Sequence, residues 1–550
     1  MKGNSFISNH FKLIGILSLV VSVHFLIALR FFGIWFLIDD FVPISTVLIY
    51  SPMEILFSRD AYALFNRWFF TPLLPISFKL DWYLFKLNPW GYHLHNYFLI
   101  LANALVIYKI TRLYLPPRYC LLAAIFFLFS VPAFINIANS SLRHYSWGCL
   151  FIFLGFYLYK RFEEKGSKKL LLFSIICYFI ATLFKSVFIL FPLAILALSQ
   201  LDLHKRFKVF VLYTVIFLLY FLWRIHILGG LGGYTFIPTP DLLHAISTLF
   251  LNIPYIIGKT IWRIPFFTYF IFLGLIIIKP RLGIILFFLT LLSATPFIFT
   301  KPSETYSFTG KFILISAMVA IAMAFLVYYL AIKIKESFRP YFCYLICSLI
   351  LILQVTNLPG AFREAYASSQ FIKNTCHKLL EQDVKVLYDP YAWVYNYFYL
   401  VRSLQGEKLS LIGIGTLDRN DLYLDLYLYQ RYINSLSDSE FIFIAAKGKI
   451  FRYIELKKEV EALQEKETLS RPVIALKNKA NLLSGRIMDK RVNGHFKAYL
   501  FSPLTERNIL FWSIPIRRKA FSCPIRKGEI ILFLFVSSDG RFSPPLIFKN

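Results

Sequence analysis

The feature that most constrains this chain is a series of apolar runs long enough to cross a lipid bilayer. A membrane-spanning helix needs about 17–25 mostly apolar residues. The runs that meet or approach this length are 13–38, 92–111, 118–136, 145–159, 170–184, 187–201, 209–228, 264–278, 282–299, 312–332 and 341–358. Because hydrocarbon offers no hydrogen-bond partners to the backbone, each run must fold as a helix. The sequence therefore predicts an α-helical polytopic membrane protein with about eleven transmembrane helices.

The composition agrees with lipid as the solvent of this chain. Hydrophobic residues make up 58% of the 550 residues, aromatic residues 19% and charged residues only 16%. Soluble domains carry about 25% charged residues. This balance excludes a disordered chain, a collagen-like repeat and a coiled coil, and it disfavours an ordinary cytosolic enzyme.

The net charge of +29 has two candidate explanations, nucleic-acid binding and the enrichment of cations in cytoplasmic loops. The cations gather in every second connection between the predicted spans: Lys109, Arg112 and Arg118; Lys160, Arg161, Lys165, Lys168 and Lys169; Lys205, Arg206 and Lys208; Lys279 and Arg281; Lys333, Lys335 and Arg339. Lys2 and Lys12 precede the first span. This alternation predicts a multi-pass membrane protein with a cytoplasmic N-terminus, and no nucleic-acid partner.

The opposite side of the membrane receives the longer connections. Residues 39–91 form the first outer loop, and residues 229–263 form a second one. Within the second, the stretch 242–262 is apolar but is interrupted by polar residues and a proline, which favours an interfacial or re-entrant segment. If this stretch crossed the membrane, the span count would become twelve and the C-terminus would move to the cytoplasm.

The composition changes after residue 358. Residues 1–358 are predicted to form the transmembrane domain, and 359–550 a soluble domain outside the membrane. Short β-like runs at 384–388, 440–445 and 529–536 alternate with turn residues, and 455–467 carries helical charge spacing. The C-terminal domain is therefore expected to be α+β or β-rich.

Two adjacent carboxylates, Asp39 and Asp40, follow the first span directly. Carboxylates at the edge of the hydrocarbon are costly and commonly functional, although a solvated acidic helix end is an equally good interpretation of this pair alone. Successive helical residues point about 100° apart. The two side chains would therefore take different roles, one as a general base and one orienting a substrate hydroxyl.

The run from Asn66 to Arg112 carries a family resemblance. Its elements Pro-Leu-Leu-Pro-Ile-Ser-Phe, Leu-Asp-Trp and Leu-Asn-Pro-Trp-Gly-Tyr-His resemble the first outer loop and second span of the GT-C superfamily of integral-membrane glycosyltransferases. The similarity is to the polyprenyl-phosphate-sugar-dependent branch, which includes protein O-mannosyltransferases. An acidic pair closes the first span in that family, as Asp39-Asp40 does here, and Arg143 in Ser-Ser-Leu-Arg-His takes the place of a family arginine.

The resemblance implies a set of site residues. Asp39 and Asp40 would be catalytic, and cations at outer ends of spans would hold the phosphate of the donor: Arg143, Arg67, Lys185, Lys301 and Lys311. For each cation alone, snorkelling at the interface is the more common role. Candidate substrate contacts are His93, His144, Glu304 and Tyr306. No metal site or other cofactor is implied, although the acidic pair could ligate a divalent ion.

The function expected from these features is sugar transfer from a polyprenyl-phosphate donor to an envelope acceptor, which is a lipid, a polysaccharide or a protein. The enzyme would be a hexosyltransferase or pentosyltransferase that inverts the anomeric centre. Alternatives are a transporter or flippase for a lipid-linked saccharide, a polysaccharide polymerase or ligase, and an inactive relative with a scaffolding role. A transporter would be expected to show internal repeats and charges near the midplane of the membrane, and the sequence shows neither convincingly.

Overall fold

The computed structural model describes residues 2–549 except 67–68, 231–241, 296, 298–304, 306–308, 382–385, 389–409, 413–418, 429, 432–440, 445–448, 480–481, 489–493, 503–506, 516–519, 526–527 and 529. Its chain divides into two compact units. The first comprises Met1–Leu37, Phe69–Trp223 and Thr239–Gln370, and the second comprises Ile38–Trp68, Arg224–Pro238 and Phe371–Asn550. The predicted first outer loop is thus shared between the two units.

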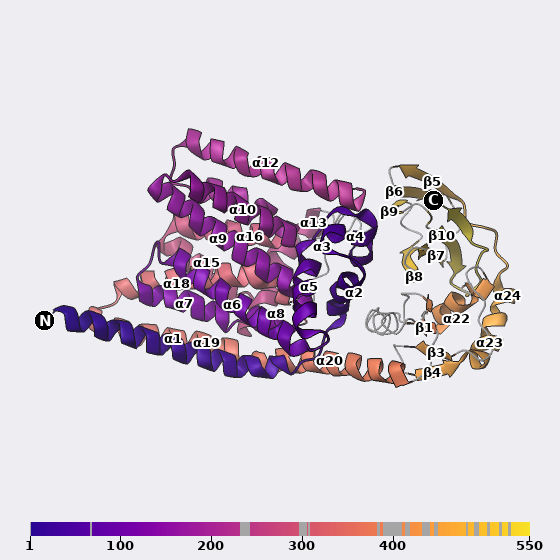
Figure 1. The fold of residues 1–550 in the computed structure, drawn as a ribbon, viewed down its shortest axis with the longest axis horizontal. Coiled ribbons are helices and arrows are strands. Elements are labelled where there is room, and N and C mark those ends of the chain that lie inside the picture. Colours follow the sequence, from indigo (N-terminus) through magenta and orange to yellow (C-terminus); the bar gives the residue numbers. More distant parts are fainter. Residues whose placement is uncertain are drawn as a thin grey trace. The chain divides into compact units, whose positions relative to one another are not determined.

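The first unit is helical, and its longer helices lie side by side (Figure 1). They are α1 (Lys2–Phe32), α5 (Leu73–Phe85), α6 (Pro89–Thr111), α7 (Pro117–Leu128), α8 (Val131–Ala138), α9 (Arg143–Lys165), α10 (Lys168–Phe184), α11 (Phe191–Leu198), α12 (Leu203–Leu228), α13 (Leu242–Ser247), α14 (Ile253–Ile257), α15 (Phe267–Ile278), α16 (Pro280–Ala294), α18 (Ile313–Lys333), α19 (Arg339–Val355) and α20 (Leu358–Glu381). One buried apolar core joins residues from α1 to α20.

Among the described residues, each of the eleven apolar runs predicted from the sequence overlaps a helix. Within the described residues, five helical segments are long and apolar enough to cross a membrane, and seven if each of two bent pairs counts as one span. The chain is therefore an integral membrane protein with many helices, and the number of eleven spans stays a prediction.

The two bent pairs have identifiable causes. Between α7 and α8 the axis turns by 51°, and Pro132 in the first turn of α8 cannot continue the preceding helix. The second pair, Ala245–Trp262 and Phe267–Ile278, turns by 101°. Its turn contains two positive φ angles, at Arg263 and Phe266. A bend of this size occurs in a broken span as well as in a re-entrant segment, so the interfacial or re-entrant character of 242–262 stays a prediction.

The second unit contains three short helices and a β-rich region. The helices are α2 (Phe41–Ile49), α3 (Pro52–Phe57) and α4 (Arg59–Phe65). The other elements are β1 (Val386–Tyr388), β2 (Ser410–Ile412), α22 (Arg419–Leu428), β3 (Phe441–Ile444), β4 (Lys449–Arg452), α23 (Tyr453–Glu461), α24 (Leu463–Lys466), β5 (Ile474–Lys479), β6 (Leu482–Ile487), β7 (Gly494–Ser502), β8 (Arg507–Pro515), β9 (Ala520–Pro524), β10 (Ile530–Ser537) and β11 (Leu546–Lys549).

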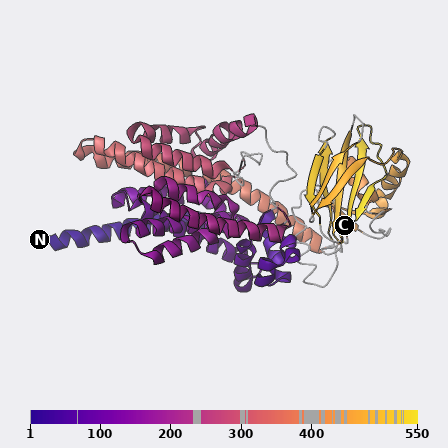
Figure 2. The ribbon, with the colours of Figure 1, turned by 90° about the horizontal axis from the view of Figure 1, so that it is seen from above.

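The strands form two sheets, and they are drawn as yellow and orange arrows near the C-terminus in Figure 2. The larger sheet has the order β11-β10-β7-β8-β2-β1-β3-β4, with β1 parallel to β2 and β3 and β7 antiparallel to β8 and β10. Strand β10 is buried on both faces: Leu532 and Leu534 pack with α22 and α23, whereas Ile531 and Phe533 pack with the small β5-β6-β9 sheet. This mixed αβ architecture matches the expected C-terminal domain.

The close approach of α15 and α16 depends on a glycine. A Cβ atom at Gly283 would lie 2.6 Å from the backbone nitrogen of Ile276, whereas one at Gly274 would meet only a movable leucine methyl at 3.3 Å. We predict that Gly283→Ala lowers the free energy of unfolding by about 1–3 kcal/mol, because the backbone must shift.

The measurement is the denaturation midpoint of the purified protein in detergent micelles. Gly274→Ala is the matched control and should unfold close to the wild type. Equal midpoints for Gly283→Ala and the wild type would contradict the close packing of this pair.

Candidate active site

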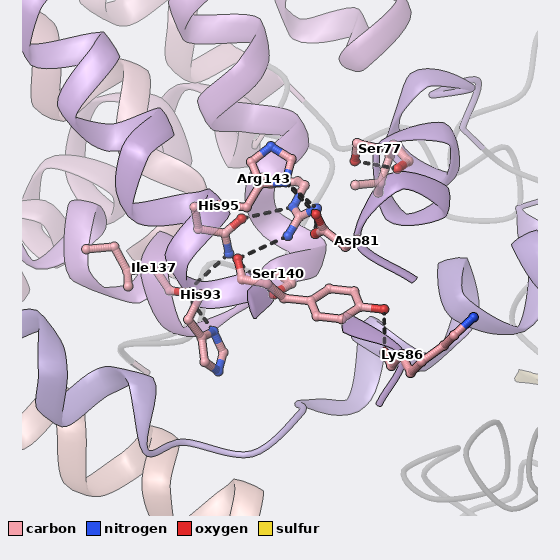
Figure 3. Close-up of polar contacts among 11 residues, drawn as sticks. Ser77, Asp81, Lys86, His93, His95, Ile137, Ser140 and Arg143 are labelled. Atoms are coloured by element: carbon pink, nitrogen blue, oxygen red, sulfur yellow. Dashed lines mark hydrogen bonds and ion pairs between the residues drawn. The ribbon is translucent and has the colours of Figure 1, made fainter. Parts of the chain in front are cut away.

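A fully buried arginine organises the first polar cluster, which we call the Arg143 network (Figure 3). Arg143 is the first residue of α9, and its guanidinium forms an ion pair through Nη1 with Asp81 of α5. Its Nε donates to Oδ1 of Asn96 at 2.9 Å, and its Nη2 donates to the carbonyl oxygen of Tyr92 at 3.3 Å. The guanidinium carbon also lies 4.6 Å from the ring centre of Phe78. Burial of this charge is stabilised because its hydrogen-bond donors meet oxygens.

Asp81 connects Arg143 to a histidine. Its Oδ1 lies 2.7 Å from Nδ1 of His95, whose side chain is 18% exposed whereas that of Asp81 is 1% exposed. With Nδ1–H donating to the carboxylate, the other ring nitrogen of His95 is left to face outward. The His95 ring meets Trp147 edge to face at 5.8 Å. Asp81 therefore fixes the orientation of one buried cation and one partly exposed imidazole.

The network depends on where α5 and α8 end and where α6 begins. Asn88 caps α6 by accepting from the backbone N–H of Trp90, and the hydroxyl of Tyr92 donates to the carbonyl oxygen of Lys86. These contacts fix the connection between α5 and α6 and so place Asp81 opposite His95 and Asn96. Asn96 extends the network by donating to the Ile137 carbonyl oxygen at the end of α8.

His93, predicted as a substrate contact, is fully buried one helical turn from Asn96. Its two ring nitrogens each lie 2.9 Å from a carbonyl oxygen, that of Ile34 and that of Ile137. The ring thereby ties the chain just after α1 to the end of α8. In this position His93 orders the ends of helices rather than facing solvent.

Lys185, Lys311 and His144 form a second cluster, which we call the cation cluster. Both lysines lie close enough to His144 to act on it electrostatically. The Lys185 ammonium lies 4.6 Å from the ring centre of Phe69 and 5.1 Å from that of Tyr145. The structure therefore brings together two predicted phosphate ligands and one predicted substrate contact from α9, the end of α10 and the start of α18.

Backbone contacts hold Lys311 in this place. Asn136 of α8 donates to the carbonyl oxygen of Gly310 at 2.6 Å, and Ser146 of α9 donates to Asn136 at 2.8 Å. A Cβ atom at position 310 would lie 2.5 Å from a methyl carbon of Leu142 and 2.6 Å from one of Ile135, so a larger residue would require these side chains to move. The segment that carries Lys311 is therefore anchored to the N-terminal end of α9, where His144 lies.

His144 presents an unsatisfied nitrogen in this cluster. Its Nδ1 lies 2.5 Å from the carbonyl oxygen of Ser141, and its buried Nε2 has no hydrogen-bond partner among the described residues. When Nδ1–H donates to Ser141, a neutral imidazole leaves Nε2 as an acceptor. Buried polar atoms are normally paired, so this unpaired acceptor, on which the charges of two lysines act, is a candidate ligand contact.

The acidic pair belongs to the second unit. Asp39 and Asp40 form a single short turn before α2, and Asp40 occupies the N-cap position of that helix. The side chain of Asp39 is exposed and that of Asp40 is fully buried. Different environments for the two carboxylates agree with the expectation that they point in different directions.

Several predicted site residues lie outside the described residues: Arg67, Lys301, Glu304 and Tyr306. In the part of the chain that the structure describes, no group of three or more His, Cys, Asp or Glu side chains is placed to hold a metal ion.

Sequence reasoning assigned no role to Asp81, His95 or Asn96 as a group. Asp81 stands in the Leu-Asp-Trp element, and His95 and Asn96 follow the Gly-Tyr-His element after one leucine. The sequence did contain one indication, because the Asp81 carboxylate stands between two apolar stretches. A carboxylate whose helix packs into the protein needs a cation as a buried partner. Which cation it meets depends on tertiary packing.

Comparisons with solved structures show what the chain is similar to. Two crystal structures of ArnT from Cupriavidus metallidurans are similar to this chain, one in the apo state and one bound to undecaprenyl phosphate. Their TM-scores are 0.49 and 0.44, each at 12% identity over 84% of this chain and 96% of that chain. No family model and no curated protein matches the sequence. The function proposed below therefore depends on the residues of this chain.

The ion pair of Arg143 and Asp81 gives a stability prediction. We expect Asp81→Asn to lower the free energy of unfolding by about 3–5 kcal/mol, because Arg143 then remains buried as an uncompensated charge. The measurement is unfolding of the purified protein in mixed detergent micelles.

Glu164→Gln is the control, because Glu164 pairs with Arg161 at the surface with side-chain exposures of 47% and 32%. That substitution should change stability by at most about 1 kcal/mol. Equal effects of the two substitutions would show that the Arg143 network is not buried as described.

Proposed function

We propose that this protein is an integral-membrane glycosyltransferase of the GT-C type that uses a polyprenyl-phosphate sugar donor. The observation that carries the proposal is the cation cluster, in which the charges of Lys185 and Lys311 act on His144, whose buried Nε2 has no hydrogen-bond partner among the described residues. These residues lie at one end of the membrane helices of the first unit, where a lipid-linked phosphate can enter from the bilayer.

The chemistry of such a donor requires cations at this place. As the C1–O bond breaks, negative charge grows on the phosphate of the departing polyprenyl phosphate. Lys185 and Lys311 would stabilise this charge before and during transfer. The rings of Phe69 and Tyr145 lie against the Lys185 ammonium and lower the local polarity, which strengthens its attraction for an anion.

We assign His144 to a hydroxyl group rather than to the phosphate. Its Nδ1–H donates to Ser141, so its Nε2 accepts a proton donor such as a sugar hydroxyl. The phosphate and the first sugar are covalently linked in the donor. A hydroxyl-binding imidazole next to phosphate-binding lysines therefore suits a glycosyl phosphate.

The acidic pair would supply the base. We assign the base to Asp39, whose exposed carboxylate would take the proton of an acceptor hydroxyl as the acceptor oxygen attacks C1. Attack from the face opposite the departing phosphate inverts the anomeric centre. Asp40, buried at the N-terminus of α2, would position this turn.

The Arg143 network would support the site indirectly. Arg143 is buried and its donors are directed at Asp81, Asn96 and Tyr92, so we propose that it positions the N-terminal end of α9. His144 follows Arg143 directly, and the same end of α9 therefore orients the substrate-binding imidazole. In this proposal Arg143 acts through its neighbours and is not a ligand of the phosphate.

The remaining assignments follow from the resemblance. Arg67 and Lys301 would complete the phosphate site, and Glu304 and Tyr306 would contact the sugar or the acceptor. The acceptor would be an envelope lipid, polysaccharide or protein outside a bacterial inner membrane, with the N-terminus in the cytoplasm and residues 359–550 outside. No metal ion is needed, because cations of the chain supply the electrostatic stabilisation.

Removal of the acidic pair should abolish transfer. We predict that Asp39→Asn with Asp40→Asn lowers the transfer rate by about 10²–10⁴-fold, because no general base remains. Envelope glycans of a deletion strain carrying the wild-type or the variant gene would be compared by mass spectrometry, with membrane expression of both proteins measured.

Asp60→Asn, on α4 of the same segment, is the matched control and should restore the wild-type glycan pattern. A wild-type glycan pattern in the double variant would overturn the assignment of the base.

Loss of a lysine from the cation cluster should weaken donor binding. We predict that Lys185→Gln raises the Kd for undecaprenyl phosphate by about tenfold or more, because a hydrogen bond to a charged group contributes about 1.5–3 kcal/mol. Native mass spectrometry of the purified full chain would measure binding.

Lys169→Gln, an exposed lysine at the beginning of α10, is the charge-matched control and should bind as the wild type does. Unchanged binding by Lys185→Gln would remove the cation cluster from the donor site.

A further inference from the structure

The first unit contains a large cavity that the proposed reaction does not use. Its volume is about 600 Å³, and its walls come from α6, α9, α11, α16 and α18. One stripe of α18 lines it, formed by Leu314, Met318, Ile321, Phe325 and Tyr329. These residues extend over about 22 Å at 1.5 Å per residue. The cavity is therefore elongated along the membrane helices.

The lining divides sharply by polarity. Thr111, Tyr114, Ser199, Gln200, Lys279, Arg281 and Tyr329 line the cavity at one end of the helices, which we call the basic mouth. The remaining length is almost entirely apolar, with residues such as Phe156, Leu289 and Met318. A hydrocarbon chain suits such walls, because they offer it apolar contacts like those of the bilayer.

The charges of the basic mouth indicate that the ligand carries an anionic head group. Glu163 is already paired with Lys160 and accepts from Ser199 at 2.6 Å, and Arg206 donates to the Ser199 carbonyl oxygen at 2.8 Å. In contrast, Lys279 contacts the ring of Tyr329 at 5.2 Å, and Arg281 forms no ion pair or hydrogen bond within the described residues. Two cations thus remain for an anion at this end.

We propose that this cavity binds one acyl chain of an anionic bilayer phospholipid, with its phosphate at Lys279 and Arg281. The cavity extends about 22 Å along the helices. One leaflet is half of a hydrocarbon core about 30 Å thick, so the cavity is longer than one leaflet and can hold most of an acyl chain. Basic pockets between membrane helices are suited to anionic head groups. The site is independent of sugar transfer, because its cations lie at the opposite ends of α16 and α18 from Lys311.

The test uses the full chain in lipid nanodiscs. The probe is a phosphatidylglycerol with a diazirine in one acyl chain, compared with a phosphatidylcholine carrying the same chain. After photolysis, adducts on peptides of α16 and α18 are counted by mass spectrometry. We expect phosphatidylglycerol to label these peptides about tenfold more than phosphatidylcholine, because each cation near an anionic head contributes about 1 kcal/mol.

Two variants separate the chain site from the head site. Leu289→Trp fills the cavity and should abolish the adducts, whereas Phe288→Trp, on an exposed neighbour that does not line the cavity, should not. Lys279→Gln with Arg281→Gln should equalise labelling by the two lipids. Lys333→Gln with Lys335→Gln, which removes two exposed cations near the same end of α18, should keep the preference.

Three results would overturn the proposal. These are equal labelling of the wild type by both lipids, adducts that persist in Leu289→Trp, and displacement of the probe by undecaprenyl phosphate at lower concentration than by unlabelled phosphatidylglycerol. The last result would assign the cavity to the lipid of the sugar donor. A midpoint of denaturation equal to that of the wild type confirms that each variant is folded.

Discussion

Hydrocarbon supplies no hydrogen bonds, and the membrane unit of this protein is built around that constraint. Its backbone is helical wherever a long apolar run occurs, because only a helix pairs its own N–H and C=O groups. The same constraint governs side chains. Arg143 is fully buried, and its guanidinium is directed at a carboxylate, an amide oxygen and a carbonyl oxygen. Polar residues in this unit are therefore tied to particular partners on other helices.

The same hydrogen bonds and ion pairs also determine where a buried polar atom is left without a partner among the described residues. The Arg143 network and the Asn136 contact to Gly310 fix the N-terminal end of α9 against α5, α6, α8 and the segment before α18. At this fixed end, Lys185, Lys311 and His144 come together, and Nε2 of His144 remains without a partner among the described residues. Hydrogen-bonded polar groups thus surround the His144 imidazole, whose Nε2 has no partner among the described residues. Such preorganisation is what electrostatic stabilisation of a departing phosphate requires.

The fold could be predicted from the sequence further than the site. Apolar run length located helices at all eleven predicted spans, and the continuous apolar run in 529–536 located the buried strand β10. The interruptions in 242–262 favoured an interfacial or re-entrant segment, which stays a prediction, and the structure turns by 101° between that segment and α15. Site residues were harder to predict, because a sequence does not distinguish a lysine or arginine that binds a ligand from one that pairs with a buried carboxylate. Arg143 and Lys185 were both predicted to hold phosphate, yet one is buried beside Asp81 and the other lies against Phe69 and Tyr145.

The sequence by itself determined that lipid surrounds much of this protein and that its membrane part is helical. It also determined the change to an αβ domain in the C-terminal part. These properties follow from local composition and periodicity, which each segment carries without reference to the others. Only the tertiary structure decided which charges neutralise each other, which imidazole nitrogen lacks a partner and where a cavity with a basic mouth remains. Such pairings join residues as far apart as Asp81 and Arg143 or Asn136 and Gly310. They depend on how the helices pack, and packing is decided by the whole set of helices at once.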